Sequence, residues 1–259
     1  MILDKIIETK KEEVALLKKA TSVYTLMDAI ATLPPCRDFR AAISGKACSI
    51  IAEVKCASPS RGRLVEHFNP LQIAKIYEQN GAAAVSVLTD EKYFCGHKDY
   101  LTQIKQEVRI PVLRKDFIIA PLQVYETRAI GADAILLIVR VLGARLAEFI
   151  ALSKELGLSP LVEVHTQEEL DVALATGAEI IGINNRNLDT FVTDINTSRD
   201  LKKLIPAGKT IVAESAIKDR NDIEYLMTAG INAFLIGEGL VIATDIGQKL
   251  RSFLGEDDQ

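Results

Sequence analysis

Four segments of the chain share one pattern, and this repeat constrains the fold more than any other feature. In each segment a glycine closes a helical stretch and a short apolar run follows it. The segments are NGAAAVSVL from Asn80, IGADAILLI from Ile130, TGAEIIGIN from Thr176 and AGINAFLIG from Ala229. Between them lies a second set of apolar runs, SIIAEVK, IPVLRKDF, SPLVEVH and TIVAESA. Each interval of about 50 residues therefore holds two strand–helix units.

Helical patterns fill the gaps between these strands. NPLQIAKIYEQNG and TQEELDVALATG begin with a capping residue or an early acid and end at a glycine. Eight alternating strand–helix units, with strands apolar on both faces, predict a closed parallel (β/α)8 barrel of the TIM type, in the α/β class. The alternative is an open, doubly wound sheet. The even spacing of the strands and the lack of a GxGxxG motif after the first of them favour the barrel.

Residues 1–47 precede the first strand and predict a helical extension. ILDKIIETKKEEVALLKK carries a partial apolar stripe, and TLMDAIATL ends at Pro34 and Pro35. This extension is too short for a second domain. We therefore expect a single domain over residues 1–259, with the barrel at 48–259.

Composition excludes several classes of function. The net charge of −4 does not favour binding to nucleic acid, and no apolar run is long enough to span a membrane. The amino-terminal stretch does not resemble a secretory signal. Four cysteines and three histidines are scattered without metal-ligand spacing. These features predict reduced thiols, a cytoplasmic protein and no metal site.

Charged residues stand near the carboxyl ends of the second set of strands, where barrels of this type carry their active sites. Side chains two residues apart on a strand point to the same face, so Glu53 lies beside Lys55, and Lys115 shares a face with Leu113. If these faces line the barrel, Lys115 and Glu163 join the first pair in one pocket. Opposite charges there offset one another's burial and suit proton transfer. The alternative is an ion-pair cluster that only plugs the barrel.

The last two strands end in turns of small residues. These turns are AESAI around Ser215 and IGEGL around Gly237. The loops after strands seven and eight commonly bind phosphate through backbone N–H groups in this fold. The two turns therefore predict a phosphate site.

Several motifs, in this order, resemble the successive signatures of the indole-3-glycerol-phosphate synthase family: IIAEVKCASPSRG, LRKDFI, LVEVH, IGINNRNL, AESAI and FLIGEGLV. The resemblance runs from the amino-terminal helix to the end of the chain. It implies ring closure on 1-(2-carboxyphenylamino)-1-deoxyribulose 5-phosphate, with loss of carbon dioxide and water, to give indole-3-glycerol phosphate in tryptophan biosynthesis. No cofactor is implied.

The resemblance also implies roles for individual residues. Lys115 matches the general acid that polarises the sugar ketone, and Glu163 matches a general base or proton relay. Lys55 matches a lysine that holds the substrate carboxylate, Glu53 occupies a catalytic position, and Asn184 matches a residue that orients the substrate. Which lysine serves which step stays open.

Binding residues carry over in the same way. The substrate would contact the loop after the first strand, which closes over the site, an apolar wall around its anthranilate ring, and further strand-end residues: Ser58, Pro59, Phe94, Phe117, Leu136, Ile138, Arg186, Leu188 and Glu214. Core packing is the alternative for the four apolar wall residues. The phosphate contacts would come, mostly through the backbone, from Ser215, Ala216, Gly237 and Glu238.

Ala216 stands where the family usually has glycine. A glycine there would allow a positive φ, whereas alanine is penalised in that region. We therefore expect this turn to lie at negative φ, with the methyl group directed away from the phosphate. The alternative is that the alanine weakens binding at this site.

Two other functions compete with the synthase. One is a Schiff-base aldolase that uses Lys55 or Lys115 as nucleophile. The other is a barrel that has lost catalysis and serves as a binding subunit. As partners we expect a small phosphorylated substrate, no nucleic acid and no membrane. The chain is expected to be a monomer, with association with other tryptophan-pathway enzymes left open.

Overall fold

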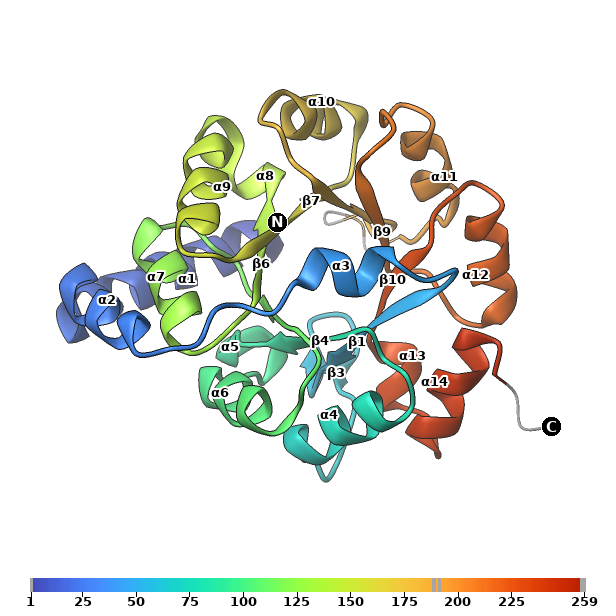
Figure 1. The fold of residues 1–259 in the computed structure, drawn as a ribbon, viewed down its shortest axis with the longest axis horizontal. Coiled ribbons are helices and arrows are strands. Elements are labelled where there is room, and N and C mark those ends of the chain that lie inside the picture. The colour runs from blue at the N-terminus through green and yellow to red at the C-terminus, as the bar shows by residue number, and fades with distance from the viewer. Residues whose placement is uncertain (1, 188–189, 191, 257–259) are drawn as a thin grey trace.

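The computed structural model describes residues 2–187, 190 and 192–256, and its central feature is a closed barrel of parallel strands (Figure 1). Each strand pairs with its neighbours along the chain, and the last strand pairs with the first, at Ser49 and Ala233. All eight predicted strands are present, so the barrel is confirmed and the open sheet was the wrong alternative. The strands are β1 (Ser49–Val54), β4 (Ala84–Leu88), β5 (Val112–Lys115), β6 (Ala134–Ile138), β7 (Ser159–Val164), β8 (Ile180–Asn184), β9 (Thr210–Glu214) and β10 (Ala233–Ile236).

Helices surround the barrel in alternation with the strands. The repeated glycines explain where four of them end: Gly81, Gly131, Gly177 and Gly230 all have φ between 76° and 95°. This left-handed region is open to glycine, which terminates the helix and turns the chain toward the next strand. The helices are α4 (Pro70–Gln79), α6 (Lys98–Glu107), α7 (Pro121–Ala129), α9 (Leu146–Glu155), α10 (Gln167–Ala175), α11 (Asn196–Lys202), α12 (Arg220–Met227) and α14 (Ile246–Leu254).

Shorter elements fill the loops at the ends of the strands. They are the two-stranded sheet β2 (Ala57–Ser58) and β3 (Gly62–Arg63), the helices α5 (Glu91–Phe94), α8 (Val139–Leu142) and α13 (Glu238–Val241), and the 3-10 turn η1 (Gly143–Arg145). Those that follow β1, β4 and β10 border the functional site described below.

The strands divide the core into two parts. On β1, Ile50, Ala52 and Val54 pack outward against the helices, whereas Ile51 belongs to an inner cluster inside the barrel. This alternation is the period of two that the sequence predicts. Charged residues that continue the inner face of a strand therefore point into the barrel.

A short helix that the sequence reasoning missed closes the amino-terminal end of the barrel. In α3 (Phe39–Ser44), Phe39 and Ile43 are fully or almost fully buried in the inner cluster. Asp38 caps this helix by accepting a hydrogen bond from the N–H of Ala41. Figure 1 shows α3 lying across the strands near β10.

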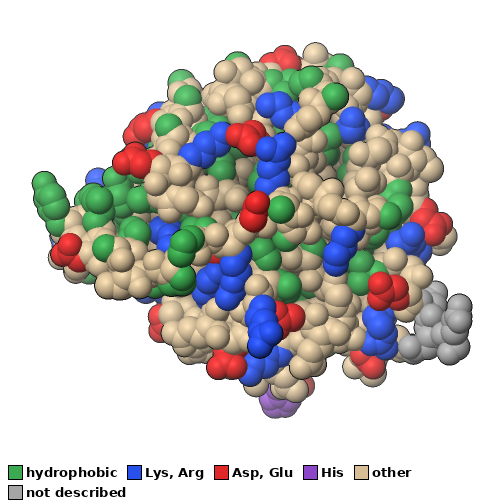
Figure 2. Space-filling view, in the orientation of Figure 1, with side chains coloured by type: hydrophobic (Ala, Val, Ile, Leu, Met, Phe, Trp, Pro, Cys, Tyr) green, Lys and Arg blue, Asp and Glu red, His purple; other side chains and the backbone are tan. Residues whose placement is uncertain are grey.

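The predicted helices of the extension are present as α1 (Ile2–Ala20) and α2 (Val23–Ala31). They lie beside α7 (Figure 1). Apolar side chains gather on the surface over α2 (Figure 2), where Tyr24 and Met27 are exposed. None of the helices in the described ranges is long and apolar enough to cross a membrane.

Candidate active site

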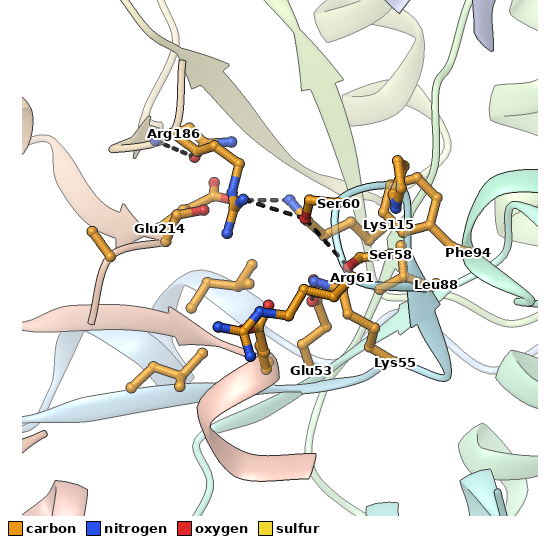
Figure 3. Close-up of a pocket in the computed structure, with 18 of the residues that line it drawn as sticks. Glu53, Lys55, Ser58, Ser60, Arg61, Leu88, Phe94, Lys115, Arg186 and Glu214 are labelled. Carbon is orange, nitrogen blue, oxygen red and sulfur yellow. Dashed lines mark hydrogen bonds and ion pairs between the residues drawn. The ribbon is translucent and has the colours of Figure 1, made fainter. Parts of the chain in front are cut away.

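A cavity of about 810 Å³ opens at the carboxyl ends of the strands. Every predicted site residue except Leu188 lines it, and Leu188 lies outside the described residues. Figure 3 shows that Glu53 and Lys55, from β1 and its carboxyl end, approach Lys115 of β5 and Glu214 of β9 around this space. The topology of the barrel therefore brings together Glu53 and Glu214, which are 161 positions apart in the sequence.

Lys115 forms the centre of the charged cluster. Its Nζ lies 2.8 Å from Oε2 of Glu214 and 3.2 Å from Oε2 of Glu163. A second pair stands beside it, with Lys55 Nζ 2.6 Å from Oε1 of Glu53. The three glutamates are buried, whereas the lysines keep 15% and 17% of their side-chain surface exposed. The lysine side chains are therefore the part of the cluster that a bound molecule can reach.

Burial and charge fix the protonation of this cluster. Burial lowers the pKa of Lys115, but the carboxylates of Glu214, Glu163 and Glu53 outweigh it and raise the pKa above its usual value. Burial raises the pKa of Glu163, but Lys115 and His165 outweigh it and hold the pKa well below its usual value. At neutral pH Lys115 is thus an ammonium and Glu163 a carboxylate.

Glu214 titrates near neutral pH. Burial raises its pKa to about 7; repulsion from Glu163 and Glu53 acts in the same direction, while Lys115 opposes it. A carboxyl group with such a pKa can both accept and donate a proton under physiological conditions. The sequence-based assignment placed Glu214 among the binding residues, and its contact with Lys115 shows that it also belongs to the charged cluster.

His165 continues the inner face of β7 beyond Glu163. Its Nε2 lies 3.3 Å from Oε1 of Glu163, and its Nδ1 lies 3.0 Å from Oε2 of Glu169. Burial alone would lower its pKa, but the two carboxylates raise the pKa to about 9. The alternation Leu161, Glu163, His165 was the available signal for this contact, although His165 was not among the predicted site residues.

This shift predicts a pH dependence of stability. Because the folded-state pKa of His165 is raised, its contribution is fully present below pH 6.5 and is lost as the pH rises through about 9. The shift corresponds to about 3 kcal/mol at most. His165→Asn should therefore lower the free energy of unfolding more at pH 6 than at pH 9.5, measured by urea unfolding. An equal loss at both pH values would contradict the assignment.

Two glycines make room for the buried carboxylates. A side chain at Gly237 would collide with the carboxylate of Glu53, and one at Gly182 would collide with that of Glu214. Gly237 was predicted from its turn, as a phosphate residue; its clearance of Glu53 is a further reason for glycine there. Gly182 was missed, because nothing local in IGINNRNL points to a neighbouring strand's carboxylate.

Apolar side chains form one wall of the cavity. The rings of Phe94 and Phe117 lie 6.2 Å apart, centre to centre, and are tilted by 37°. Leu136 and Ile138 also line the cavity and are almost fully buried in the inner cluster. The two aliphatic residues thus belong both to the hydrophobic core of the barrel and to the wall of the cavity. Contact of these four residues with substrate stays a prediction.

The turn after β9 differs from the expectation. Ser215 and Ala216 both have φ of 63°, so the prediction of a negative φ at Ala216 was wrong. Asn185 Nδ2 donates a hydrogen bond to the carbonyl oxygen of Ser215, at 3.2 Å, and helps to hold this turn. The tertiary contacts therefore impose a left-handed backbone on a residue that carries a Cβ.

This strain predicts the effect of Ala216→Gly. Glycine relieves about 1 kcal/mol of steric cost, part of which the more flexible unfolded chain offsets. We expect the free energy of unfolding to rise by up to about 1 kcal/mol, and Tm by about 2 °C. Ala229→Gly, in a turn where alanine has no positive φ, is the matched control and should give no gain. A lower Tm for Ala216→Gly would show that the turn carries no strain.

Loop residues complete the cavity, and the sequence reasoning missed four of them, Ser60, Arg61, Lys218 and Lys249. Arg61 lies 3.0 Å from Glu238, joining the loop after β1 to the turn after β10. Arg186 Nη1 donates to Ser60 Oγ at 3.5 Å (Figure 3). Asn184 Oδ1 accepts from the N–H of Arg186. Two further lysines line the cavity together with the predicted phosphate turns, Lys218 and Lys249.

The extension contributes to the cavity as well. Ile2, Leu3 and Ile6 of α1 line it. The sequence reasoning treated this segment as an appendage on the barrel, because no local pattern shows where the helix packs. Within residues 2–187, 190 and 192–256, no group of three or more His, Cys, Asp or Glu side chains is arranged to hold a metal ion.

A family model described as indole-3-glycerol phosphate synthase matches residues 3–253. This chain belongs to the indole-3-glycerol phosphate synthase family. Curated relatives of that name agree. The chain is 47% identical over 257 residues to the one from Desulforamulus reducens, covering 98% of this chain and 97% of the relative. It is 51% identical over 249 residues to the one from Chlorobaculum tepidum, covering 95% of this chain and 97% of the relative.

Solved structures outside the indole-3-glycerol phosphate synthase family share the barrel. A 3-hexulose-6-phosphate synthase matches with a TM-score of 0.65 at 14% identity, over 81% of this chain and 100% of the other. Thiamine phosphate pyrophosphorylase from Pyrococcus furiosus matches with a TM-score of 0.62 at 14% identity, over 81% of this chain and 95% of the other. At such low identity these matches support the fold alone.

Proposed function

We infer that this chain closes the indole ring of 1-(2-carboxyphenylamino)-1-deoxyribulose 5-phosphate and releases carbon dioxide and water, giving indole-3-glycerol phosphate. It thus acts as a carboxy-lyase of tryptophan biosynthesis. The observation that carries this inference is the position of Lys115, an ammonium held between Glu163 and Glu214 in a cavity with one apolar wall. Family membership over nearly the whole chain supports it.

The first step needs a proton donor, because an aromatic carbon is a weak nucleophile. Lys115 donates a proton to the ketone oxygen as the ring carbon that bears the carboxylate attacks the ketone carbon. A new carbon–carbon bond forms and the ketone oxygen becomes a hydroxyl. Loss of carbon dioxide then returns its bonding electron pair to the ring. In this proposal the ammonium of Lys55, which lines the same cavity, holds the substrate carboxylate before this loss.

The second stage removes water. The hydroxyl leaves with one further proton, and the carbon next to the nitrogen loses one proton to give the indole. Glu163 is ionised and lines the cavity, and in this proposal it takes up the latter proton and passes it on to Glu214, whose pKa of about 7 makes it the stronger base of the two. Two protons are consumed and one is released, so each turnover takes up one proton. Glu214 lies 2.8 Å from Lys115 and has a pKa of about 7, so it can return a proton to Lys115.

The aldolase alternative finds no support in Lys115. A Schiff-base lysine must be a free amine, and its pKa is usually lowered. Here three carboxylates raise the pKa of Lys115, so it is held as an ammonium.

The proposed activity is tested by incubating the purified chain with the substrate and identifying the products by mass spectrometry. We expect indole-3-glycerol phosphate, and no covalent adduct after borohydride treatment. Failure to form this product would contradict the proposal. A borohydride-trapped adduct on Lys55 or Lys115 would favour the aldolase.

Location and assembly are further parts of the proposal. All four cysteines are free, which supports a reducing compartment such as the cytoplasm. We propose that the chain acts as a monomer on its small phosphorylated substrate, since the described part of one chain supplies residues on every side of the cavity. The elution volume of the purified chain on a calibrated column tests this assembly state.

A further inference from the structure

Lys10 is a buried charge at a distance from the reacting groups. It lies on α1, and only 1% of its side chain is exposed. Its Nζ lies 2.8 Å from Oδ2 of Asp90, 2.9 Å from Oδ1 of Asp116 and 2.7 Å from Oε2 of Glu13. Asp90 and Asp116 belong to the barrel, in the loops after β4 and β5. The ammonium therefore joins the extension to two neighbouring strand ends.

Asp90 connects Lys10 to one aromatic wall of the cavity. Its Oδ1 accepts the N–H of Tyr93 at 2.7 Å and caps α5, the four-residue helix that carries Phe94. Its Oδ2 has no hydrogen-bond partner among the described residues, and Lys10 is the cation that lies against it. Loss of Lys10 would thus leave a buried carboxylate oxygen without its counter-charge.

Asp116 connects Lys10 to the general acid. It stands between Lys115 and Phe117, and its Oδ1, the atom that contacts Lys10, also accepts the N–H of Phe117 at 2.8 Å. Its Oδ2 accepts from Thr89 at 2.5 Å and from Arg114 at 3.1 Å. A shift of this carboxylate would move the backbone on both sides of it.

The same face of α1 reaches the cavity. Leu3 and Ile6 line the cavity, and Lys10 follows them at helical spacing on that face. Thr9 directly precedes Lys10, and its Oγ1 lies 3.1 Å from the hydroxyl of Tyr93 in α5. The position of this part of the wall therefore depends on how α1 is held.

We propose that Lys10 is a positioning residue of the active site, which ties α1 to Asp90 and Asp116 and thereby sets the positions of Phe94, Lys115 and Phe117. The proposal rests on the proposed function. The buried side chain is charged, because Asp116 and Asp90 outweigh the lowering effect of burial and raise its pKa. Lys10 touches no reacting atom and acts through the two aspartates.

Lys10→Met tests this role, with Lys105→Met as the matched control. Lys105 is also largely buried and lies 2.6 Å from Asp133, but Asp133 precedes β6, at the opposite end of the barrel. Both variants should have a lower Tm than the wild type. Below both Tm values, kcat/KM should fall at least 10-fold for Lys10→Met, with a lower kcat and a higher KM, and stay within 2-fold of wild type for Lys105→Met. Equal effects of the two variants would overturn the proposal.

The variant Lys10→Met/Asp90→Asn separates positioning from charge balance. It removes the ammonium together with one carboxylate, and asparagine still caps a helix well. We expect Tm to recover in part while kcat/KM stays at least 10-fold low. Wild-type kcat/KM in this variant would show that Lys10 only neutralises buried charge and would overturn the proposal.

Amide hydrogen exchange gives a readout that is independent of activity. In Lys10→Met, exchange should become at least 10-fold faster in residues 91–97 and 116–118 and stay unchanged in α12. Unchanged exchange in the first two segments would overturn the proposal. A wild-type chain that forms no indole product would instead contradict the proposed function, and the exchange data would still decide the role of Lys10.

Discussion

Replacing Lys115 by methionine is expected to lower kcat by at least about 100-fold while the barrel stays folded, since general acid catalysis contributes on this scale. Methionine keeps the length of the side chain but has no proton to donate. Glu163 retains its contact with His165, and Glu214, with its pKa of about 7, can become neutral by protonation. The two carboxylates are therefore not both left as unpaired buried charges.

The measurement is steady-state formation of the indole product, with circular dichroism and Tm to confirm the fold. Lys75→Met is the control. Lys75 pairs with Glu107 at 2.7 Å on the surface, so its replacement makes the same chemical change away from the cavity. It should keep wild-type kcat. A folded Lys115→Met protein with near-normal turnover would exclude Lys115 as the general acid.

The second large effect concerns the pair formed by Glu53 and Lys55. Lys55→Met alone should lower the free energy of unfolding by about 3 kcal/mol or more, because it leaves the buried carboxylate of Glu53 without its cation. Glu53→Gln/Lys55→Met removes both charges at similar volume and should recover most of that stability. If both residues act on the substrate, the double variant should nevertheless keep less than about 1% of wild-type activity.

Activity and Tm of the two variants distinguish a catalytic pair from a structural plug. A plug predicts that the double variant is stable and still active. A catalytic pair predicts that stability and activity separate, with the first recovered and the second lost. Near-wild-type turnover in the double variant would therefore contradict the proposed roles of Glu53 and Lys55.

The main features of the fold and the charged cluster could be predicted from local patterns. The glycines at 81, 131, 177 and 230 mark helix ends because φ of 76–95° is costly for other residues. Period two fixed which strand residues point inward, and strand direction fixed which end they occupy. Glu53, Lys55, Lys115 and Glu163 follow from these two rules alone.

What was missed depends on contacts between segments far apart in the chain. From the sequence alone, Lys10 is one of many charged residues on a helix predicted to lie at the surface. Only the packing of α1 shows that it lies against Asp90 and Asp116. Gly182 is required because of a carboxylate on the next strand. The φ of Ala216 was mispredicted for the same reason, since local preference alone favours a negative value and the surrounding turn overrides it.

The central claim is that this cavity performs ring closure with decarboxylation and dehydration, driven by proton transfer from the lysine–glutamate cluster. The most direct test measures three quantities in one weakly buffered reaction: indole formed by fluorescence, carbon dioxide released, and protons taken up from solution. We expect one carbon dioxide for each indole product, and one proton taken up when uptake is recorded before the carbon dioxide is hydrated, because formation of bicarbonate releases a proton again. Substrate consumption without indole, or indole formed without matching carbon dioxide release and proton uptake, would contradict it.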